Sequence, residues 1–82
     1  MEGSNLMTQQ RQHQINPEKL MLSKWTAVTP THKEKHFLVV RVLRDEAEII
    51  THCVLEAVIN HREIELDWRL LKDANQWLLG WR

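Results

Sequence analysis

The stretch HFLVVRVLRDEAEIITHCVLEAVINHREIELDW, from His36 to Trp68, decides the fold of this 82-residue chain. It is the only long segment in which apolar residues recur at every second position, and this period is typical of β-strands. Polar clusters around Asp45 and Asn60 divide the stretch into three parts. The pattern therefore predicts three consecutive antiparallel strands joined by two hairpins.

The register of these hairpins determines which side chains share a face, because a slip of one residue inverts a strand. A two-residue second turn at Asn60-His61 pairs Leu55 with Leu66. For the first connection we expect a longer loop, Asp45 to Glu48, because Glu46 is unsuited to the positive φ of a type I′ turn. Loops of two or four residues predict the same packed face: Leu38, Val40, Val42, Ile49, Thr51, Cys53, Leu55, Ala57, Ile59, Ile64, Leu66 and Trp68.

The segment before this meander carries a helix signal and a strand signal. Asn16-Pro17-Glu18 resembles a helix start, with a capping side chain, a proline at the first position and an acidic residue at the positive end. The helix can only be short, ending at about Leu22. Lys24 to Thr29 is predicted as a fourth strand, because three strands alone are marginally stable.

After Trp68 the two-residue period ends. Arg69 to Leu71 allows a helical turn, and Asp73 to Gln76 resembles a capping box. A one-turn helix there, stopped by Gly80, would place Trp77 and Trp81 on one face.

We therefore predict a mainly β fold, a curled antiparallel meander of three to four strands with short helical turns at both ends. Closure into a small SH3-like barrel is the alternative. Residues 15–82 are expected to form one domain, and residues 1–14 a disordered polar arm.

Composition narrows the setting in which the protein works. The 11 basic and 11 acidic residues balance, which argues against a polyanion-binding surface over the whole molecule. The single cysteine, Cys53, precludes an intrachain disulfide and favours a reducing compartment. The first thirty residues contain no signal-like apolar run, and no segment reaches the length of a membrane span. We expect a cytoplasmic protein without a membrane partner.

Four motifs together resemble the short bacterial tryptophan-rich family of conserved hypothetical proteins. They are SKWTAV (Ser23 to Val28), EKHFLV (Glu34 to Val39), DWRLLKD (Asp67 to Asp73) and WLLGW (Trp77 to Trp81). The resemblance extends over about Ile15 to Arg82. It implies a self-contained bacterial domain whose function is not established, and it carries over no catalytic residue.

The residues themselves predict no enzyme, cofactor or metal site. Cys53 falls on the packed face whereas His52 points to the other side, and a thiol buried among apolar groups is inert. His32 and His36 are four residues apart, but they straddle the boundary between a loop and a strand. No further close pair completes the four ligands of a structural zinc site.

Two features favour a binding function, and a protein partner is the preferred prediction. Trp77 and Trp81 are candidates for partial exposure, although folding back to cap a small core would use the same residues. Glu63, Glu65 and Asp67, beside Glu56, form an acidic strip that could receive a basic partner. The more ordinary interpretation of the strip is a solvated face whose carboxylates pair with nearby arginines or lysines. An unpaired edge strand leaves both a monomer and an edge-strand homodimer open.

Nucleic-acid binding is the alternative function. Cations interleaved with aromatic rings can neutralise phosphates while bases stack on the rings. The candidates are Lys24, Trp25, Lys33, Lys35, Phe37 and Arg41, with His32 and His36 nearby. A solvated lysine-rich loop, with Trp25 in the core, is the competing interpretation.

Overall fold

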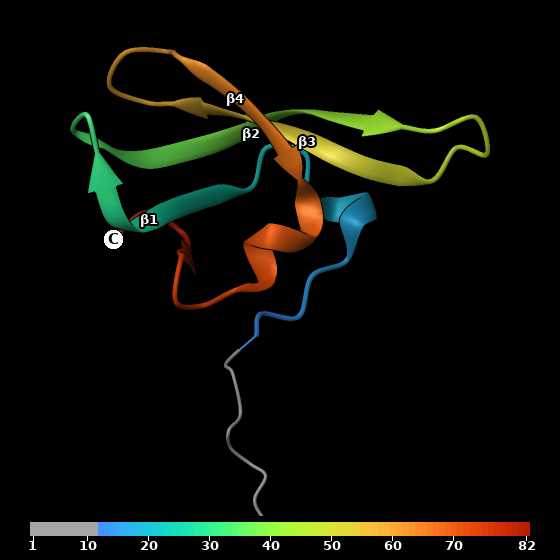
Figure 1. The fold of residues 1–82 in the computed structure, drawn as a ribbon, viewed down its shortest axis with the longest axis horizontal. Coiled ribbons are helices and arrows are strands. Elements are labelled where there is room, and N and C mark those ends of the chain that lie inside the picture. The colour runs from blue at the N-terminus through green and yellow to red at the C-terminus, as the bar shows by residue number, and fades with distance from the viewer. Residues whose placement is uncertain (1–11) are drawn as a thin grey trace, which may run out of the picture.

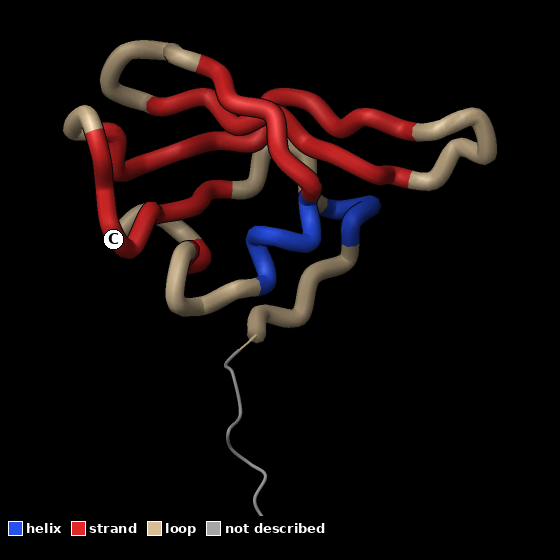
Figure 2. The backbone as a smooth tube through the Cα atoms, viewed as in Figure 1, coloured by secondary structure: helices blue, strands red, loops and turns tan. Residues whose placement is uncertain are grey.

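The computed structural model describes residues 12–82, and these form one five-stranded antiparallel sheet (Figures 1 and 2). The spatial order is β4-β3-β2-β1-β5. The elements are η1 (Pro17–Lys19), β1 (Lys24–Thr31), β2 (Glu34–Arg44), β3 (Ile50–Ala57), β4 (Glu63–Asp67), η2 (Trp68–Lys72) and β5 (Trp77–Leu79), where η denotes a 3₁₀ helix. The mainly β meander with short helical turns is confirmed. The sheet is open, so the barrel alternative does not form.

The second hairpin keeps the predicted faces but has a longer loop. Leu55 lies opposite Ile64 and Cys53 opposite Leu66, two residues away from the pairing that a two-residue turn gives. The Ala57 N–H donates to the Arg62 carbonyl at 2.8 Å and so closes a four-residue loop, which preserves the side of every strand residue. Ile59, predicted to be packed, lies in this loop and is 61% exposed.

The first hairpin has the longer loop that the sequence predicts. Arg44 lies opposite Ile50, and the Asp45 carboxylate accepts hydrogen bonds from the backbone N–H groups of Ala47 and Ile49. Glu48 adopts a positive φ of 65° at the end of the turn. Ile49 therefore belongs to the loop and is exposed, which corrects its placement on the packed face.

A bulge in β2 makes the first half of its predicted face wrong. Val39 pairs with Leu55, but the next pair is Arg41 with Val54, so Val40 is an extra residue in the ladder. An extra residue inverts the alternation on one side of it. Phe37 and Val39 are consequently buried, in place of Leu38 and Val40. Beyond the bulge Val42 stays on its predicted face, but it lies opposite Cys53 instead of the predicted Ile49.

The predicted fourth strand is confirmed as β1, but the helix expected around Trp77 is wrong. Residues Trp77–Leu79 form β5 and pair with Ala27, Thr26 and Trp25 along the outer edge of β1. The Asp73 carbonyl accepts from the N–H groups of Gln76 and Trp77, which makes a tight turn before the strand. A strand satisfies the free edge of β1, and a one-turn helix would leave that edge unpaired.

The core lies on one face of the sheet, which we call the core face. Its buried residues are Leu20, Trp25, Phe37, Val39, Cys53, Leu55, Ala57 and Leu71. The two 3₁₀ helices lie on this side (Figure 1) and bring Leu20 and Leu71 onto the strands. The indole N–H of Trp25 donates to the Ser23 hydroxyl at 2.9 Å, so this buried ring leaves no unpaired polar atom.

Both 3₁₀ helices begin at caps that their sequences supply. The Asn16 side chain accepts from the Glu18 N–H, with Pro17 at the first position, and the Asp67 side chain accepts from the Arg69 N–H. The helical turn predicted after Asn16 is therefore confirmed, although it ends at Lys19 rather than near Leu22.

Most of the predicted N-terminal arm, residues 1–14, lies outside the described residues. Its last three residues are described, and two of them contact the domain. Gln12 forms an isolated bridge with Asp73, and His13 Nε2 donates to the Trp77 carbonyl at 2.7 Å. The His13 ring also meets the edge of the Trp25 ring at 5.7 Å. This part of the chain thus packs beside the core before Ile15.

Candidate functional site

The face of the sheet opposite the core, which we call the open face, carries most of the predicted binding residues. Since neighbouring strands pair residue by residue, side chains in one row share a face. One row contains Lys24, Leu38, Glu56 and Glu63, the next Arg41, Val54 and Glu65, and the third Leu43, His52 and Asp67. Within the described residues no helix covers this face (Figure 1), and Trp81 and Arg82 lie against it at β1 and β2.

The motif WLLGW passes from one face of the sheet to the other. Trp77 lies on the core face, where its ring meets Phe37 edge to face at 5.4 Å. Gly80 then adopts a φ of +79°, which costs glycine little and other residues much more. Trp81 follows on the side of Lys24 and His36, so the two tryptophans do not share a surface.

Trp81 is fixed in place although it is 43% exposed. Its indole N–H donates to the Phe37 carbonyl at 2.9 Å, and the Lys24 ammonium lies 4.7 Å from the centre of its ring. The His36 ring is 6.1 Å away. Thr26 Oγ1 donates to the Gly80 carbonyl and accepts from the Arg82 N–H, which ties the backbone on both sides of Trp81. The result is a held aromatic side chain that is still open to solvent.

The acidic strip on β3 and β4 is partly neutralised, as the sequence predicts. Arg41 pairs with Glu63 at 2.7 Å and Arg69 with Asp67 at 2.6 Å. Hydrogen bonds from the Arg69 side chain and backbone hold the pKa of Asp67 well below its usual range. Among the described residues Glu65 takes part in no ion pair, so the strip keeps unneutralised negative charge at β4.

The structure separates the predicted nucleic-acid residues. Trp25 and Phe37 are 1% and 3% exposed, so neither ring can stack on a base in this fold, which corrects their assignment. Arg41 is engaged with Glu63. Lys33, in the β1–β2 turn, and Lys35, at the start of β2, are exposed. The Lys24 ammonium lies over the Trp81 ring instead of the Trp25 ring.

One end of the sheet holds a buried carboxylate that no sequence motif indicates. Glu34 is 2% exposed; its carboxylate accepts from Arg62 Nε at 2.7 Å and from Asn60 Nδ2 at 2.8 Å, and also pairs with Arg62 Nη2. These hydrogen bonds, chiefly those from Arg62, lower the pKa of Glu34 to about 2. A polar hollow of about 280 Å³ lies between these residues and His32. In the sequence Glu34 is simply an acidic residue beside the β1–β2 turn. The fold brings it to the β3–β4 loop, where the side chains of Asn60 and Arg62 donate hydrogen bonds to it.

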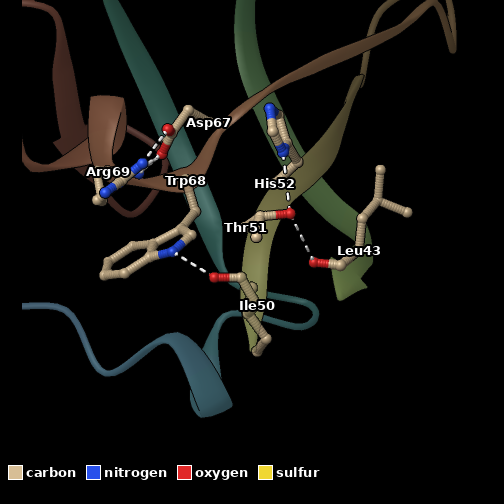
Figure 3. A network of polar contacts seen from close by, with 7 residues as sticks. All are labelled: Leu43, Ile50, Thr51, His52, Asp67, Trp68 and Arg69. Carbon is tan, nitrogen blue, oxygen red and sulfur yellow. Dashed lines mark hydrogen bonds and ion pairs between the residues drawn. The ribbon is translucent and has the colours of Figure 1, made fainter. Parts of the chain in front are cut away.

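The surroundings of Cys53 disfavour the thiolate form of its side chain. Burial, with the Asp67 carboxylate nearby, raises the pKa of Cys53 to about 11. His52 Nδ1 lies 3.0 Å from the Thr51 hydroxyl (Figure 3). The row that His52 shares with Leu43 and Asp67 places it on the open face, away from Cys53. The same view shows the Trp68 indole N–H donating to the Ile50 carbonyl at 3.0 Å. Cys53 and Trp68 are thus parts of the packing that supports β3 and β4.

Within residues 12–82, no three histidine, cysteine, aspartate or glutamate side chains gather in a group that could hold a metal ion. A second hollow, of about 290 Å³, lies on the core side between the N-terminal segment and the sheet, where Ile15, Leu20, Trp25 and Leu79 line it. No helix among the described residues has the length and apolar character needed to cross a membrane.

A protein-family model matches the part of the chain that contains all four tryptophans. The family is described as Tryptophan-rich protein (DUF2389), and the match covers residues 23–82. The chain belongs to this family. The match includes every strand found in the described part of the chain and all four tryptophans. The family description leaves the function of this tryptophan-rich domain open. No curated protein and no solved structure matches the chain.

Proposed function

We propose that the protein is a protein-interaction module whose contact surface is the open face around Trp81. The observation that carries the proposal is a tryptophan that is held by its indole N–H yet remains 43% exposed. A side chain held in one conformation loses little entropy on binding, and tryptophan is among the commonest anchors of protein interfaces. Trp77, the other candidate, packs against the core on the opposite face.

The surroundings of Trp81 also support a protein partner. Leu38, opposite Lys24, adds apolar surface to the same region. The exposed Val58 is close by, because its backbone N–H donates to the carbonyl of His36, whose ring lies beside the Trp81 ring. The Lys24 ammonium lies beside Trp81, and the carboxylates of Glu63 and Glu65 lie on the same face at β4. An apolar centre with charges of both signs around it is the usual composition of a protein interface.

The test is capture of a partner by the full chain, tagged at its N-terminus, from an extract of the source cells with and without nuclease. Wild type is compared with Trp81→Ala and with a control, Ile49→Ala, which removes an exposed apolar side chain at the β2–β3 loop. We expect Trp81→Ala to lose the partner, Ile49→Ala to retain it, and nuclease to have no effect. Equal recovery by both folded variants would contradict the proposal.

A second candidate function, binding of single-stranded nucleic acid, is favoured by the Lys24 ammonium beside the Trp81 ring. Lys33 and Lys35 could add phosphate contacts, but the burial of Trp25 and Phe37 leaves the described part of this surface with one usable ring. The test is fluorescence anisotropy of a labelled oligonucleotide over a range of salt concentrations. Affinity that falls steeply with salt and is lost in Trp81→Ala would favour this function. No binding at low salt would exclude it.

Several narrower statements stay predictions. The cytoplasmic location rests on the unpaired Cys53, and the bacterial origin rests on the resemblance in the four motifs. That the chain catalyses no reaction, uses no cofactor and binds no metal is likewise a prediction. Gel filtration with light scattering will decide between a monomer and an edge-strand homodimer.

A further inference from the structure

Within residues 12–82, no strand pairs with the backbone groups on the outer edge of β4. β4 is the edge strand on one side of the sheet. The hydrogen bond from the Ala57 N–H to the Arg62 carbonyl shows which residues of β4 direct their backbone groups toward β3. Because backbone groups alternate in direction along an antiparallel strand, Ile64 and Leu66 direct theirs toward β3. Glu63 and Glu65 therefore direct their N–H and C=O groups outward.

The side chains along this edge alternate in character as well as in direction. Glu63 and Glu65 stand on the open face, and Ile64 and Leu66 lie half-buried on the core face. The Glu63 carboxylate shares its charge with Arg41 in an exposed pair, which is worth little in water. The edge thus offers hydrogen-bonding groups, negative charge on one side and apolar surface on the other.

The opposite edge of the sheet and a second copy of this chain fit less well. β5 has only three residues, and the chain turns away from it at Gly80. Two β4 strands paired edge to edge would bring Glu63 and Glu65 of both copies onto one face, where like charges destabilise the pairing. The negative charge of this edge therefore disfavours pairing with a second β4 strand and favours pairing with a cationic strand.

We propose that the outer edge of β4 binds an extended segment of a partner protein in which lysine or arginine alternates with apolar residues. This inference rests on the proposed interaction function and specifies the partner's chemistry. The segment adds a sixth strand to the sheet, with its cations beside Glu63 and Glu65 and its apolar side chains beside Ile64 and Leu66. Main-chain hydrogen bonds hold the segment, and the alternation sets its register.

The test is an NMR titration of the full ¹⁵N-labelled chain with a synthetic probe, the capped heptapeptide Thr-Lys-Val-Lys-Val-Lys-Thr. Shift changes are expected at Glu63 to Asp67, with slower hydrogen exchange at the N–H groups of Glu63 and Glu65. In the proposed geometry the lysines lie opposite these glutamates, so the peptide's lysine N–H groups point at β4 and its valine N–H groups point away.

Two N-methylated peptides of equal charge separate strand addition from charge attraction alone. Methylation at the lysines should weaken binding about tenfold or more, because it removes the inter-strand hydrogen bonds, whereas methylation at the valines should leave binding unchanged. Glu65→Gln should weaken binding roughly threefold, and the control Glu46→Gln, in the β2–β3 loop, should not.

Equal binding of the two methylated peptides, shift changes away from β4, or no shift changes at low salt would each overturn the inference. These results are distinct from failure of the proposed function. If Trp81→Ala loses its partner while the peptide leaves β4 unchanged, the interaction module stands and the strand-addition mode falls. If Trp81→Ala retains its partner, the open face around Trp81 is not the contact surface.

Discussion

On the core face the strands bury Trp25, Phe37 and Leu55 beneath two 3₁₀ helices, whereas on the open face the same strands present charged side chains to solvent. Each face contains one tryptophan of the WLLGW motif, and the two indole rings have different surroundings. Trp77 packs against the core cluster, and Trp81 packs against a lysine and a histidine. The difference indicates that one face supplies stability, and that the other can change its contacts without unfolding the sheet.

The largest expected effect is on the core face. Trp25→Ala removes the largest fully buried side chain and should lower the free energy of unfolding by about 3–5 kcal/mol, from lost burial and the cavity left behind. Urea unfolding followed by circular dichroism measures this. A loss no greater than that of Trp81→Ala would break the distinction between the two faces.

Trp77→Ala should have a smaller effect, of about 2 kcal/mol, because its side chain is only half-buried at the margin of the core. The same unfolding experiment applies, with Trp81→Ala as the matched control from the same motif. A greater loss of stability in Trp81→Ala would reverse the roles assigned to the two tryptophans.

The end of the sheet where Glu34 meets Arg62 should make stability depend on pH. The pKa of Glu34 is about 2 in the folded protein, below its ordinary value of 4.5. Its contribution is therefore fully present above pH 4.5 and is lost as the pH falls from 4.5 toward 2. Melting temperatures over this range should fall less in Glu34→Gln than in the wild type, and equal slopes would contradict the assignment.

The smallest expected effect on stability belongs to Trp81. Trp81→Ala should lower the free energy of unfolding by about 1 kcal/mol or less, since it removes a half-exposed ring and one cation–π contact. Its effect on partner capture should be large. A stability loss comparable with that of Trp25→Ala would show instead that Trp81 completes the fold.

Much of this arrangement follows from the alternation of residues, and the errors have local causes. The period of two identified β2 to β4, the marginal stability of three strands indicated β1, and the turn residues indicated the longer loop after Arg44. The bulge at Val40 was not visible, because Val39, Val40 and Arg41 all suit a regular strand. The short run Trp77–Leu79 is equally compatible with a helix or a strand, and the free edge of β1 decides between them.

The candidate site was only partly accessible to such reasoning. Pairing of Arg41 and Arg69 with the acidic strip could be foreseen because like charges on neighbouring strands require nearby cations. The ion pair of Glu34 with Arg62 joins the start of β2 to the β3–β4 loop, and the contact of Trp81 with Lys24 joins the tail to β1. Both depend on distances in space that no sequence period encodes.

The pairing of β5 with β1 also affects the order in which the sheet can be completed. Thr26 and the Gly80 carbonyl that it contacts are 54 residues apart in the chain, whereas the hairpins of β2, β3 and β4 close over short loops. Closing a long loop loses more chain entropy than closing a hairpin. The meander is therefore expected to form first, with the β1 edge left bare until the last strand has been synthesised and docks beside it.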